Sequence, residues 1–362
     1  MASKPGLIEH CGAPGAHASG SPTAFTSRLC GGAPGAYASG SPTSRACDLC
    51  GRDQFDLVSH RDRHGNPLPT AICSYCGLVG HLNIPDDAQL ADFYEKQYRL
   101  DYHGEATPGR RRVMRAWNNG QIICRRLAPL LQKHDRVFEV GAGTGATVKQ
   151  FELAGFAASG IEPGEGFQDF AGNQLHADVA RRNLFDLPGE ARHDLVLLVH
   201  VIEHFNSPTR ALSRIHSLLK PGGRLYVECP NLSAPFTVRS RMFHVAHIHN
   251  FTHSSLSMLA EKCGFRIETQ YSDDHDPNLK VLFRRAESGR LIVDPENYTQ
   301  TLCELDRNNA RNYYLRWRYL WPRLQKSISY LHEFLMARRV VRKILTTCAA
   351  THHDSSSHRR AA

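Results

Sequence analysis

The sequence predicts an α/β fold built on a mainly parallel sheet, with a small metal-stabilised module in front of it. Two observations carry this prediction. From about residue 117 to 285, short apolar segments of strand length alternate with amphipathic segments of helix length, and one strand ends in a glycine-rich turn. Before that region, two Cys-x-x-Cys pairs bound a short segment. Such alternation is typical of parallel sheets with right-handed crossovers, and such cysteine pairs are typical of zinc sites.

The elements of the alternating region follow from hydrophobic periodicity. The segment 194–199 (DLVLLV) is apolar throughout, as expected of a strand that is buried on both faces. Two late strands have only a short connection and should therefore pair antiparallel. We expect helices over 118–131, 147–154 and 208–219, and strands over 136–140, 156–161, 194–199, 224–229, 265–270 and 280–284.

Composition divides the chain further. Residues 1–44 are rich in Gly, Ala, Ser and Pro and contain a duplication, GAPGAHASGSPT followed by GAPGAYASGSPT, which lacks the large apolar residues of a core. We expect a disordered duplicated segment at 1–44, a zinc ribbon at 45–82, a helical linker at 83–116, the sheet domain at 117–285, a basic helical extension at 286–350 with a break at Pro322, and a disordered tail at 351–362. Four aromatic residues should pack the linker onto its neighbours: Phe93, Tyr94, Tyr98 and Tyr102.

Charge and cysteine usage limit the class of protein. The 362 residues carry a net charge of +9, which suits an anionic partner as well as a soluble basic surface. Eleven cysteines, an odd number, do not form a disulfide framework and indicate a reducing compartment. The sequence shows neither a signal-peptide segment nor an apolar run of transmembrane length. We therefore expect a cytoplasmic protein.

The paired cysteines predict a structural zinc site. Cys47 and Cys50 (CDLC) and Cys73 and Cys76 (CSYC) are each followed by a glycine, which makes a tight knuckle that aims two thiolates at one point. Two redox dithiols are the alternative. A shell of four thiolates leaves no open coordination position, so the zinc would stabilise the fold and take no part in chemistry.

The glycine-rich turn, VFEVGAGTGATV, predicts a nucleotide-type cofactor site. Gly141, Gly143 and Gly145 let the backbone turn sharply and approach a ligand. The pattern also fits a dinucleotide fold. Glu139 favours S-adenosylmethionine, because a carboxylate there can hold a cationic ammonium and would repel a pyrophosphate. Glu162 (SGIEP) can accept two ribose hydroxyls, and this feature fits both cofactors.

Four segments in order, EVGAGTGATV, GIEP, DLVLLVHVIEHFNSP and LLKPGGRLYVECPN, resemble class I S-adenosylmethionine-dependent methyltransferases. CDLC…CSYCGLV and FHVAHIHNFTHSSLSMLAEKCGF resemble the zinc-ribbon front end and the substrate-closing segment of bacterial members, which are similar to sugar C-methyltransferases. The resemblance implies a Rossmann-like seven-stranded sheet with the last strand antiparallel, followed here by the helical extension.

The resemblance also implies roles for single residues. Gly141, Gly143 and Gly145 would flank the methionine part of the cofactor, Glu139 would hold its amino group and Glu162 its ribose. The adenine should lie near 183–186, at Leu184 and Phe185, although Ala-Arg-Arg at 180–182 replaces a typical acidic position. His200, at the end of a strand, is expected to lie beside both the cofactor and the catalytic residues.

Two histidine-rich segments offer a catalytic base. His200, Glu203 and His204 follow the 194–199 strand, at the edge where sites form in open α/β sheets. We expect His204 to be the base, with Glu203 second; the alternative is that both cap the next helix. In FHVAHIHNF, the spacing of His244, His247 and His249 could bind a metal, but a loop over the acceptor with His247 or His249 as base is favoured over it. A purely structural loop remains the alternative.

The expected function is methyl transfer to a small hydroxylated metabolite, either a sugar nucleotide or a polysaccharide precursor, on carbon or oxygen. One alternative is an RNA methyltransferase that uses the ribbon and the basic tail, although no RNA-binding signature appears and we expect no nucleic-acid partner. Another is a non-catalytic scaffold whose Trp317, Tyr319 and Trp321, interleaved with arginines, contact an anionic membrane peripherally. The oligomeric state is left open.

Overall fold

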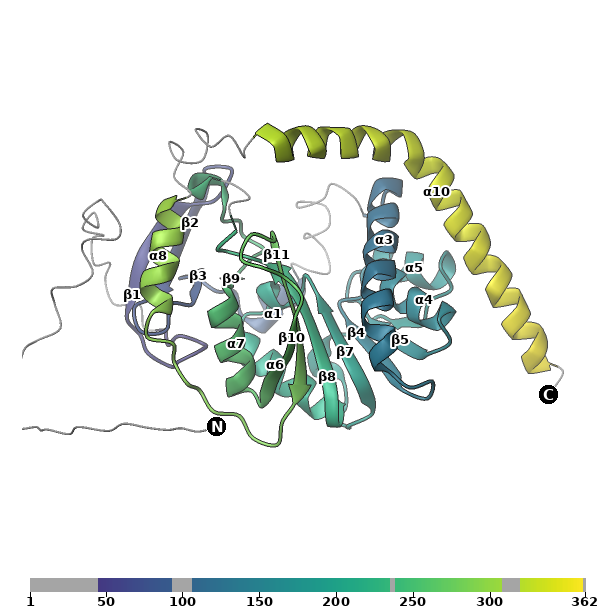
Figure 1. Cartoon of the computed structure of the whole chain (residues 1–362), viewed down its shortest axis with the longest axis horizontal. Helices are drawn as coiled ribbons and strands as arrows, with labels where there is room; N and C mark the ends of the chain where they lie inside the picture. The colour runs from purple at the N-terminus through teal and green to yellow at the C-terminus, as the bar shows by residue number, and fades with distance from the viewer. Residues whose placement is uncertain (1–44, 93–105, 235–237, 308–319, 361–362) are drawn as a thin grey trace, which may run out of the picture. The chain divides into compact units, whose positions relative to one another are not determined.

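The computed structural model describes residues 45–92, 106–234, 238–307 and 320–360 (Figure 1). The duplicated segment 1–44 and the linker residues Phe93, Tyr94, Tyr98 and Tyr102 lie outside the described residues. The same holds for Trp317 and Tyr319, and for the side chain of Trp321.

A seven-stranded sheet forms the centre of the fold, in the order β10-β11-β8-β7-β4-β5-β6. The five strands from β8 to β6 are parallel, whereas β11 is antiparallel to both β8 and β10. This confirms the expected methyltransferase-type sheet with its antiparallel last strand. The strands are β4 (Arg136–Val140), β5 (Ala157–Ile161), β6 (Val179–Ala180), β7 (His193–Val199), β8 (Leu219–Pro230), β10 (Phe265–Gln270) and β11 (Asn278–Arg285).

Helices cover both faces of this sheet (Figure 1). The alternation within β7 shows why: Leu195 and Leu197 pack with α3 and α4, whereas Val196 and Leu198 pack with α6 and α7. The longer helices are α3 (Arg110–Leu127), α4 (Ala146–Leu153), α5 (Glu165–Asn173), α6 (Pro208–Leu218), α7 (His253–Lys262), α8 (Asn297–Arg307) and α10 (Leu320–Arg360). Shorter turns are α1 (Asp87–Asp92), η2 (Ala128–Leu130), η3 (Leu184–Asp186), η4 (Ile202–His204) and η5 (Arg239–Arg241).

Several observed bounds differ from the expected ones. Helix α3 begins eight residues before the expected start at 118, because Val113 and Met114 are buried against α10. Strand β8 begins at Leu219, which we expected to end the preceding helix, and it includes the segment 220–223, for which we expected neither helix nor strand. Pro322 lies in the first turn of α10, where a missing N–H costs no hydrogen bond, so it does not break the helix.

The ribbon forms its own antiparallel sheet, in the order β1-β2-β3-β9. β1 (Phe55–Arg61), β2 (Pro67–Cys73) and β3 (Val79–His81) belong to the cysteine-bounded segment, but β9 (His249–Asn250) comes from the FHVAHIHNF segment, far along the chain. The fourth strand of the ribbon is therefore part of the predicted acceptor loop.

The C-terminal helix packs against the sheet domain through its middle part, residues 333–348. Ala337, Val341, Ile344 and Cys348 are buried, the first two against α3, and Arg115 of α3 forms an ion pair with Glu333. Helix α10 continues to Arg360, into the segment that we expected to be disordered, since neither Gly nor Pro occurs between 323 and 360 to end it.

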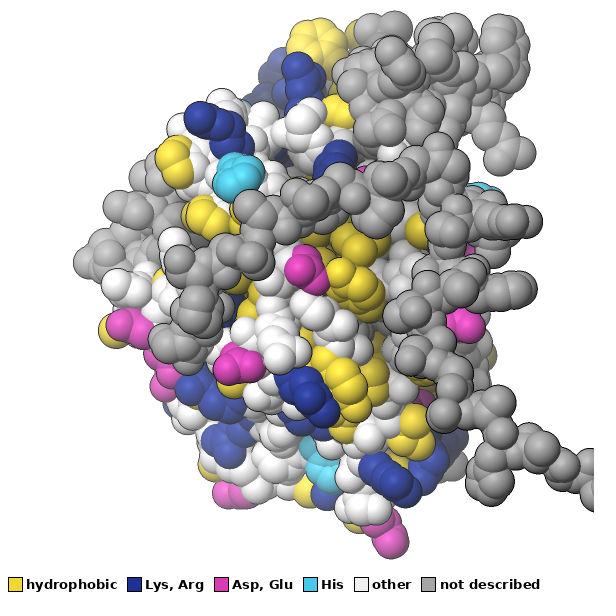
Figure 2. All heavy atoms as spheres, turned by 90° about the vertical axis from the view of Figure 1, so that its left-hand side faces the viewer, with side chains coloured by type: hydrophobic (Ala, Val, Ile, Leu, Met, Phe, Trp, Pro, Cys, Tyr) yellow, Lys and Arg dark blue, Asp and Glu magenta, His cyan; other side chains and the backbone are white. Residues whose placement is uncertain are grey.

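Two surface findings bear on partners. Figure 2 shows the face that carries β1 and α8, where Lys and Arg side chains form several separate groups among hydrophobic and acidic ones. Among the described residues, no helix combines the length and the apolar character that a membrane crossing requires.

Candidate active site

The glycine turn between β4 and α4 has the backbone that its sequence predicts. Gly141, Gly143 and Gly145 have φ values of 69°, 54° and 73°, which L-residues with a side chain rarely adopt. A Cβ on Gly141 would lie 2.6 Å from Val201 Cγ2, and one on Gly145 would lie 2.7 Å from Ala171 Cβ. A Cβ on Gly143 would meet nothing within 4 Å, so this residue faces open space.

Glu139 brings a buried carboxyl group to this turn. Its side chain lies in β4 with 3% exposure, and Oε2 accepts no hydrogen bond from any residue that the structure describes. Burial raises its pKa to about 8, against opposing hydrogen bonds from Thr147 and Val148. A buried carboxyl oxygen without a partner fits a cationic ligand group.

Glu162 fixes the turn from the end of the neighbouring strand. Its Oε2 accepts a hydrogen bond from the Gly143 amide at 2.9 Å, and its Oε1 accepts one from the Gly164 amide at 3.1 Å. Each carboxylate oxygen can accept a further hydrogen bond, so the group can still receive ligand hydroxyls.

The segment 183–186 forms the turn η3, closed by reciprocal hydrogen bonds between Asn183 and Asp186. Leu184 is buried, whereas Phe185 is exposed, with its ring edge-on to Phe205 at 6.0 Å and the Arg210 guanidinium 4.1 Å above it. Leu184 and Phe185 together offer an apolar surface of the size of a planar ring.

One cavity of about 980 Å³ joins these groups to the histidines that follow β7. The glycine turn, Glu162 and the histidines lie at the carboxyl ends of β4, β5 and β7, where ligands bind in open α/β sheets. The lining of the cavity includes Glu139, Gly141, Gly143, Glu162, Leu184 and Phe185 on one side, and His200, His204 and His247 on the other. Gly145 supports the turn and is not part of this lining.

His200 occupies a strained position at the end of β7. Its φ of 55° is left-handed, and 42% of its side chain is exposed, at the cavity. Nδ1 lies 3.5 Å from Glu203 Oε1, and Nε2 lies 3.8 Å from Glu228 Oε1. Burial lowers the pKa of His200, but the two carboxylates outweigh this effect and raise it above the ordinary value.

Glu203 lies at the centre of a histidine cluster. Its carboxylate is 1% exposed, and Oε1 lies 3.9 Å from Nε2 of His204 and 3.9 Å from Nε2 of His247. Nδ1 of His204 donates a hydrogen bond to the Ala246 carbonyl at 2.6 Å. Burial lowers the pKa of His247 well below its ordinary value, so its ring is neutral near pH 7.

The remaining predicted base, His249, does not reach the cavity. It lies in β9, where its Nδ1 donates to the Phe205 carbonyl at 3.1 Å and its ring points to Arg45 of the ribbon. His244 is also buried, and its ring is tilted against that of His247, with 3.7 Å between the ring centroids. The structure thus brings together four of the five expected catalytic residues.

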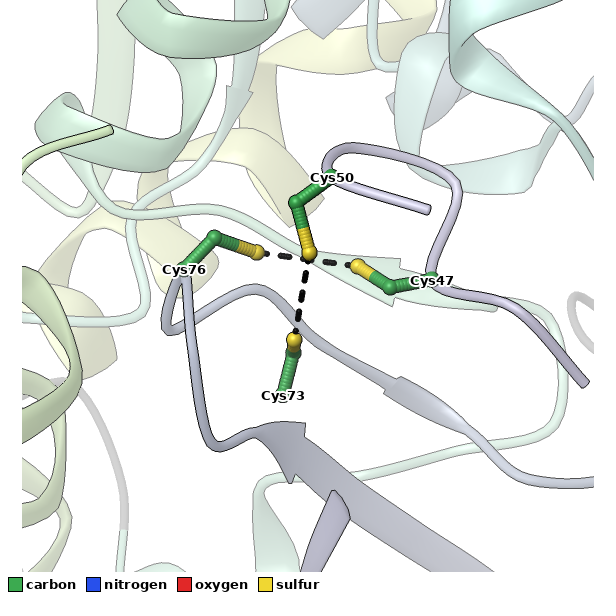
Figure 3. A group of neighbouring side chains, drawn as sticks. All are labelled: Cys47, Cys50, Cys73 and Cys76. Carbon is green, nitrogen blue, oxygen red and sulfur yellow. Dashed lines mark hydrogen bonds between the residues drawn. The ribbon is translucent and has the colours of Figure 1, made fainter. Parts of the chain in front are cut away.

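The four cysteines converge on one point (Figure 3). The sulfurs of Cys47 and Cys76 are 3.6 Å apart, and those of Cys50 and Cys73 are 3.5 Å apart. Tetrahedral zinc at about 2.3 Å from each sulfur requires separations of roughly 3.8 Å, so the donor set fits the ion.

Several residues of the site were not predicted from the sequence. Glu228 could have been found, because it lies near the carboxyl end of β8, the strand next to β7. Arg112, Asn119 and Asp87 also line the cavity, but they come from helices outside the quoted motifs and carry no local signal.

Comparisons with known proteins give a consistent result. Residues 112–270 match the family model of a methyltransferase domain. Curated relatives include an uncharacterized protein of Mycobacterium tuberculosis (strain H37Rv), 33% identical over 28% of this chain and 37% of that protein. The ubiquinone biosynthesis O-methyltransferase of Rhodopseudomonas palustris (strain TIE-1) is 32% identical over 26% of this chain and 40% of that enzyme. The chain thus spans about two fifths of the length of these relatives.

A longer match joins the chain to a protein of Mycolicibacterium smegmatis that is named a "probable S-adenosylmethionine-dependent methyltransferase", 26% identical over 54% of this chain and 77% of that protein. Among solved structures, the CcbJ methyltransferase from Streptomyces caelestis matches with a TM-score of 0.41 and 16% identity, over 54% of this chain and 96% of that one.

Proposed function

We propose that this chain, which contains a class I S-adenosylmethionine-dependent methyltransferase domain, transfers a methyl group from S-adenosylmethionine to an oxygen of a small hydroxylated metabolite. The observation that carries the proposal is the shared cavity. A donor side with Glu139, the glycine turn and Glu162 faces an acceptor side with three histidines.

The donor side fits the cofactor residue by residue. Glu139 would hold the ammonium of the methionine part, since its buried Oε2 accepts no hydrogen bond from the described residues. Glu162 would accept the ribose hydroxyls, and the adenine would lie against Leu184 and Phe185. When bound, S-adenosylmethionine supplies an electrophilic methyl group on a sulfonium.

On the acceptor side, His200 would take the proton of the reacting hydroxyl. Its ring is more exposed to the cavity than that of His204, at 42% against 12% of the side chain. Glu203 and Glu228 flank the ring on its two nitrogens and would stabilise the imidazolium that forms. His204, the base that the sequence favoured, has its Nδ1 committed to Ala246 and its Nε2 turned toward Glu203.

Two features support the acceptor class. Arg112 and Arg182 line the cavity and can meet an anionic group such as the phosphate of a sugar nucleotide or of a polysaccharide precursor. The names of the Rhodopseudomonas palustris relatives favour oxygen over carbon as the methylated atom. The sugar C-methyltransferase expectation is therefore the second candidate.

Calorimetry tests the donor site. S-adenosylmethionine and, separately, NADH are titrated into the zinc-loaded full chain, with Glu162→Gln and Glu162→Ala as variants. We expect binding of S-adenosylmethionine alone, weakened about tenfold or more in both variants. Absence of binding to folded protein would contradict the proposal, and thermal unfolding of each variant separates lost binding from lost fold.

The acceptor is then sought by release of S-adenosylhomocysteine with sugar nucleotides, phenols and total RNA as separate arms. We expect turnover with a hydroxylated small molecule. Turnover with RNA alone would overturn the proposed acceptor class and leave the donor site intact.

A further inference from the structure

We propose that Glu203, His204 and His247 form a binding site for a divalent transition-metal ion, separate from the four cysteines. Glu203 and His204 lie in η4, directly after β7, and His247 comes from the loop before β9. One ligand atom from each of the three lies within 4.8 Å of the others. Two imidazole nitrogens and one carboxylate oxygen form a donor set that zinc, cobalt and iron(II) accept.

The first argument is the state of the Glu203 carboxylate. It is 1% exposed, and neither oxygen accepts a hydrogen bond from any residue in the described part of the chain. Burying such a carboxylate is costly, and the histidines around it offset little of the cost, because His200 Nδ1 lies 3.5 Å from Oε1 and Nε2 of both His204 and His247 lies at 3.9 Å. A bound cation removes this cost.

The second argument is the orientation of the two imidazoles. Nδ1 of His204 must carry its proton, because it donates to the Ala246 carbonyl at 2.6 Å, and this leaves the lone pair of Nε2 directed toward Glu203. Metal-ligating histidines are typically fixed in this way by a carbonyl on the opposite nitrogen. His247 also presents Nε2 to Glu203, and the ring of His244 packs against its ring at a tilt.

The third argument is the rigidity of the loop that carries His247. Nε2 of His81, in the ribbon, donates to the His244 carbonyl at 3.1 Å, and the His81 amide donates to the Ile248 carbonyl at 2.9 Å. The loop is thus held on both sides of His247. An ion about 2.1 Å from each ligand requires ligand separations of roughly 3–4 Å, and the two distances of 3.9 Å to Glu203 fall within that range.

The position of the site indicates its use. His204 and His247 both line the cavity, and three protein ligands leave coordination positions open. This use of the ion rests on the proposed function: the acceptor binds the ion through the hydroxyl group that is methylated. The ion polarises that oxygen, its proton passes to His200, the oxygen–carbon bond forms and the carbon–sulfur bond breaks, so that a methyl ether and S-adenosylhomocysteine result.

Cobalt binding tests the site directly. The full chain with zinc on its cysteines is titrated with Co²⁺ and followed by visible absorption and by metal analysis. We expect about one further Co²⁺ per chain, with the weak absorption of nitrogen and oxygen ligands and without the strong thiolate charge-transfer band. Glu203→Gln and His247→Gln should each weaken this binding about tenfold or more, whereas His275→Asn, an exposed histidine outside the cavity, should not.

Two results would overturn the proposal: no further Co²⁺ bound by the folded chain, or undiminished binding in both variants. Far-ultraviolet circular dichroism and S-adenosylmethionine calorimetry on the same samples identify a variant that has lost its fold. Because the cobalt readout needs no turnover, failure of the metal site and failure of the proposed methyl transfer give different results.

Discussion

We predict that Glu139 couples cofactor binding to the release of a proton. Its pKa is raised to about 8 by burial, so the ligand-free carboxyl is mostly protonated at pH 7, whereas an ammonium requires the carboxylate. Binding of S-adenosylmethionine at pH 7 should therefore release a proton, and affinity should rise with pH up to about 8. Calorimetry in two buffers that differ in ionisation enthalpy measures the release.

The matched variant is Glu139→Gln, which keeps the shape and removes the titration. Its binding enthalpy should be the same in both buffers and its affinity about tenfold lower. The raised pKa also fixes a stability trend. Relative to this variant, the wild-type free energy of unfolding should fall as pH rises from about 4.5 to about 8, because the folded state binds the proton more tightly than the unfolded state. If the binding enthalpy depended on the buffer equally in the wild type and in Glu139→Gln, the coupling of cofactor binding to a proton would be refuted.

His200 is expected to be essential for turnover. We predict that His200→Asn lowers kcat about 100-fold, with S-adenosylmethionine affinity nearly unchanged. Asn is chosen because it tolerates the left-handed φ of 55° that this position requires. The measurement is S-adenosylhomocysteine release with the acceptor found above, and His275→Asn is the control. A variant that keeps wild-type kcat would remove His200 from the mechanism.

At the scale of single residues, the sequence predicted those residues of the candidate site that belong to local motifs. Glu139 and the three glycines lie on one strand–turn–helix segment, so their proximity follows from chain order, whereas Glu162 joins them because the strand that it follows, β5, pairs with β4. The exclusion of His249 could not be foreseen, because it depends on the pairing of β9 with a strand of the ribbon. The contact of His200 with Glu228 likewise depends on two strands being neighbours in the sheet.

Among the elements, the ribbon and the acceptor loop form one unit. We predict that Cys50→Ser, which removes a partly exposed member of the four-cysteine cluster, lowers acceptor turnover about tenfold or more but changes S-adenosylmethionine affinity less than about threefold. The reason is that β9 and the loop before it are held by β3 and His81, whereas the donor residues lie on β4 and β5. Metal analysis, calorimetry and hydrogen exchange over 243–250 provide the three readouts.

Cys303→Ser, a cysteine of α8 outside the cluster, is the control for this experiment. Equal loss of donor affinity and turnover in Cys50→Ser would mean that the ribbon supports the whole fold and not the acceptor loop in particular.

Elements with strong periodicity, such as β7 and α6, were predicted within one or two residues, whereas a two-residue strand such as β9 has no period to detect.

For the molecule as a whole, α10 contributes stability to the sheet domain. We predict that removal of residues 320–362 lowers Tm by more than about 4 °C, because Val113 and Met114 lose the cover of Ala337 and Val341. Glu333→Gln, which breaks only the ion pair with the half-exposed Arg115, should lower Tm by less than about 2 °C. Differential scanning calorimetry measures both, and equal values for the full and truncated chains would refute the packing role.

The class of fold was predictable from β7, which is written as a continuous apolar run and is buried on both faces, and from the alternation of strand-length and helix-length segments around it. The course of the C-terminal region was not. Its helix is defined by a surface on α3 that composition does not reveal, and an acidic residue of this otherwise basic region, Glu333, forms an ion pair with Arg115 of α3.

The borrowed strand of the ribbon has a consequence for synthesis. A ribosome releases residues 45–81 long before His249 and Asn250, so the outer edge of β3 emerges with its amide and carbonyl groups unpaired. Such an edge recruits other strands, and a nascent chain must protect it until β9, near the start of the last third of the polypeptide, has been made. The ribbon begins before the sheet domain but is completed only after β4 to β8 have been made, and a gene fragment that ends before codon 249 encodes a ribbon whose β3 edge is left without β9.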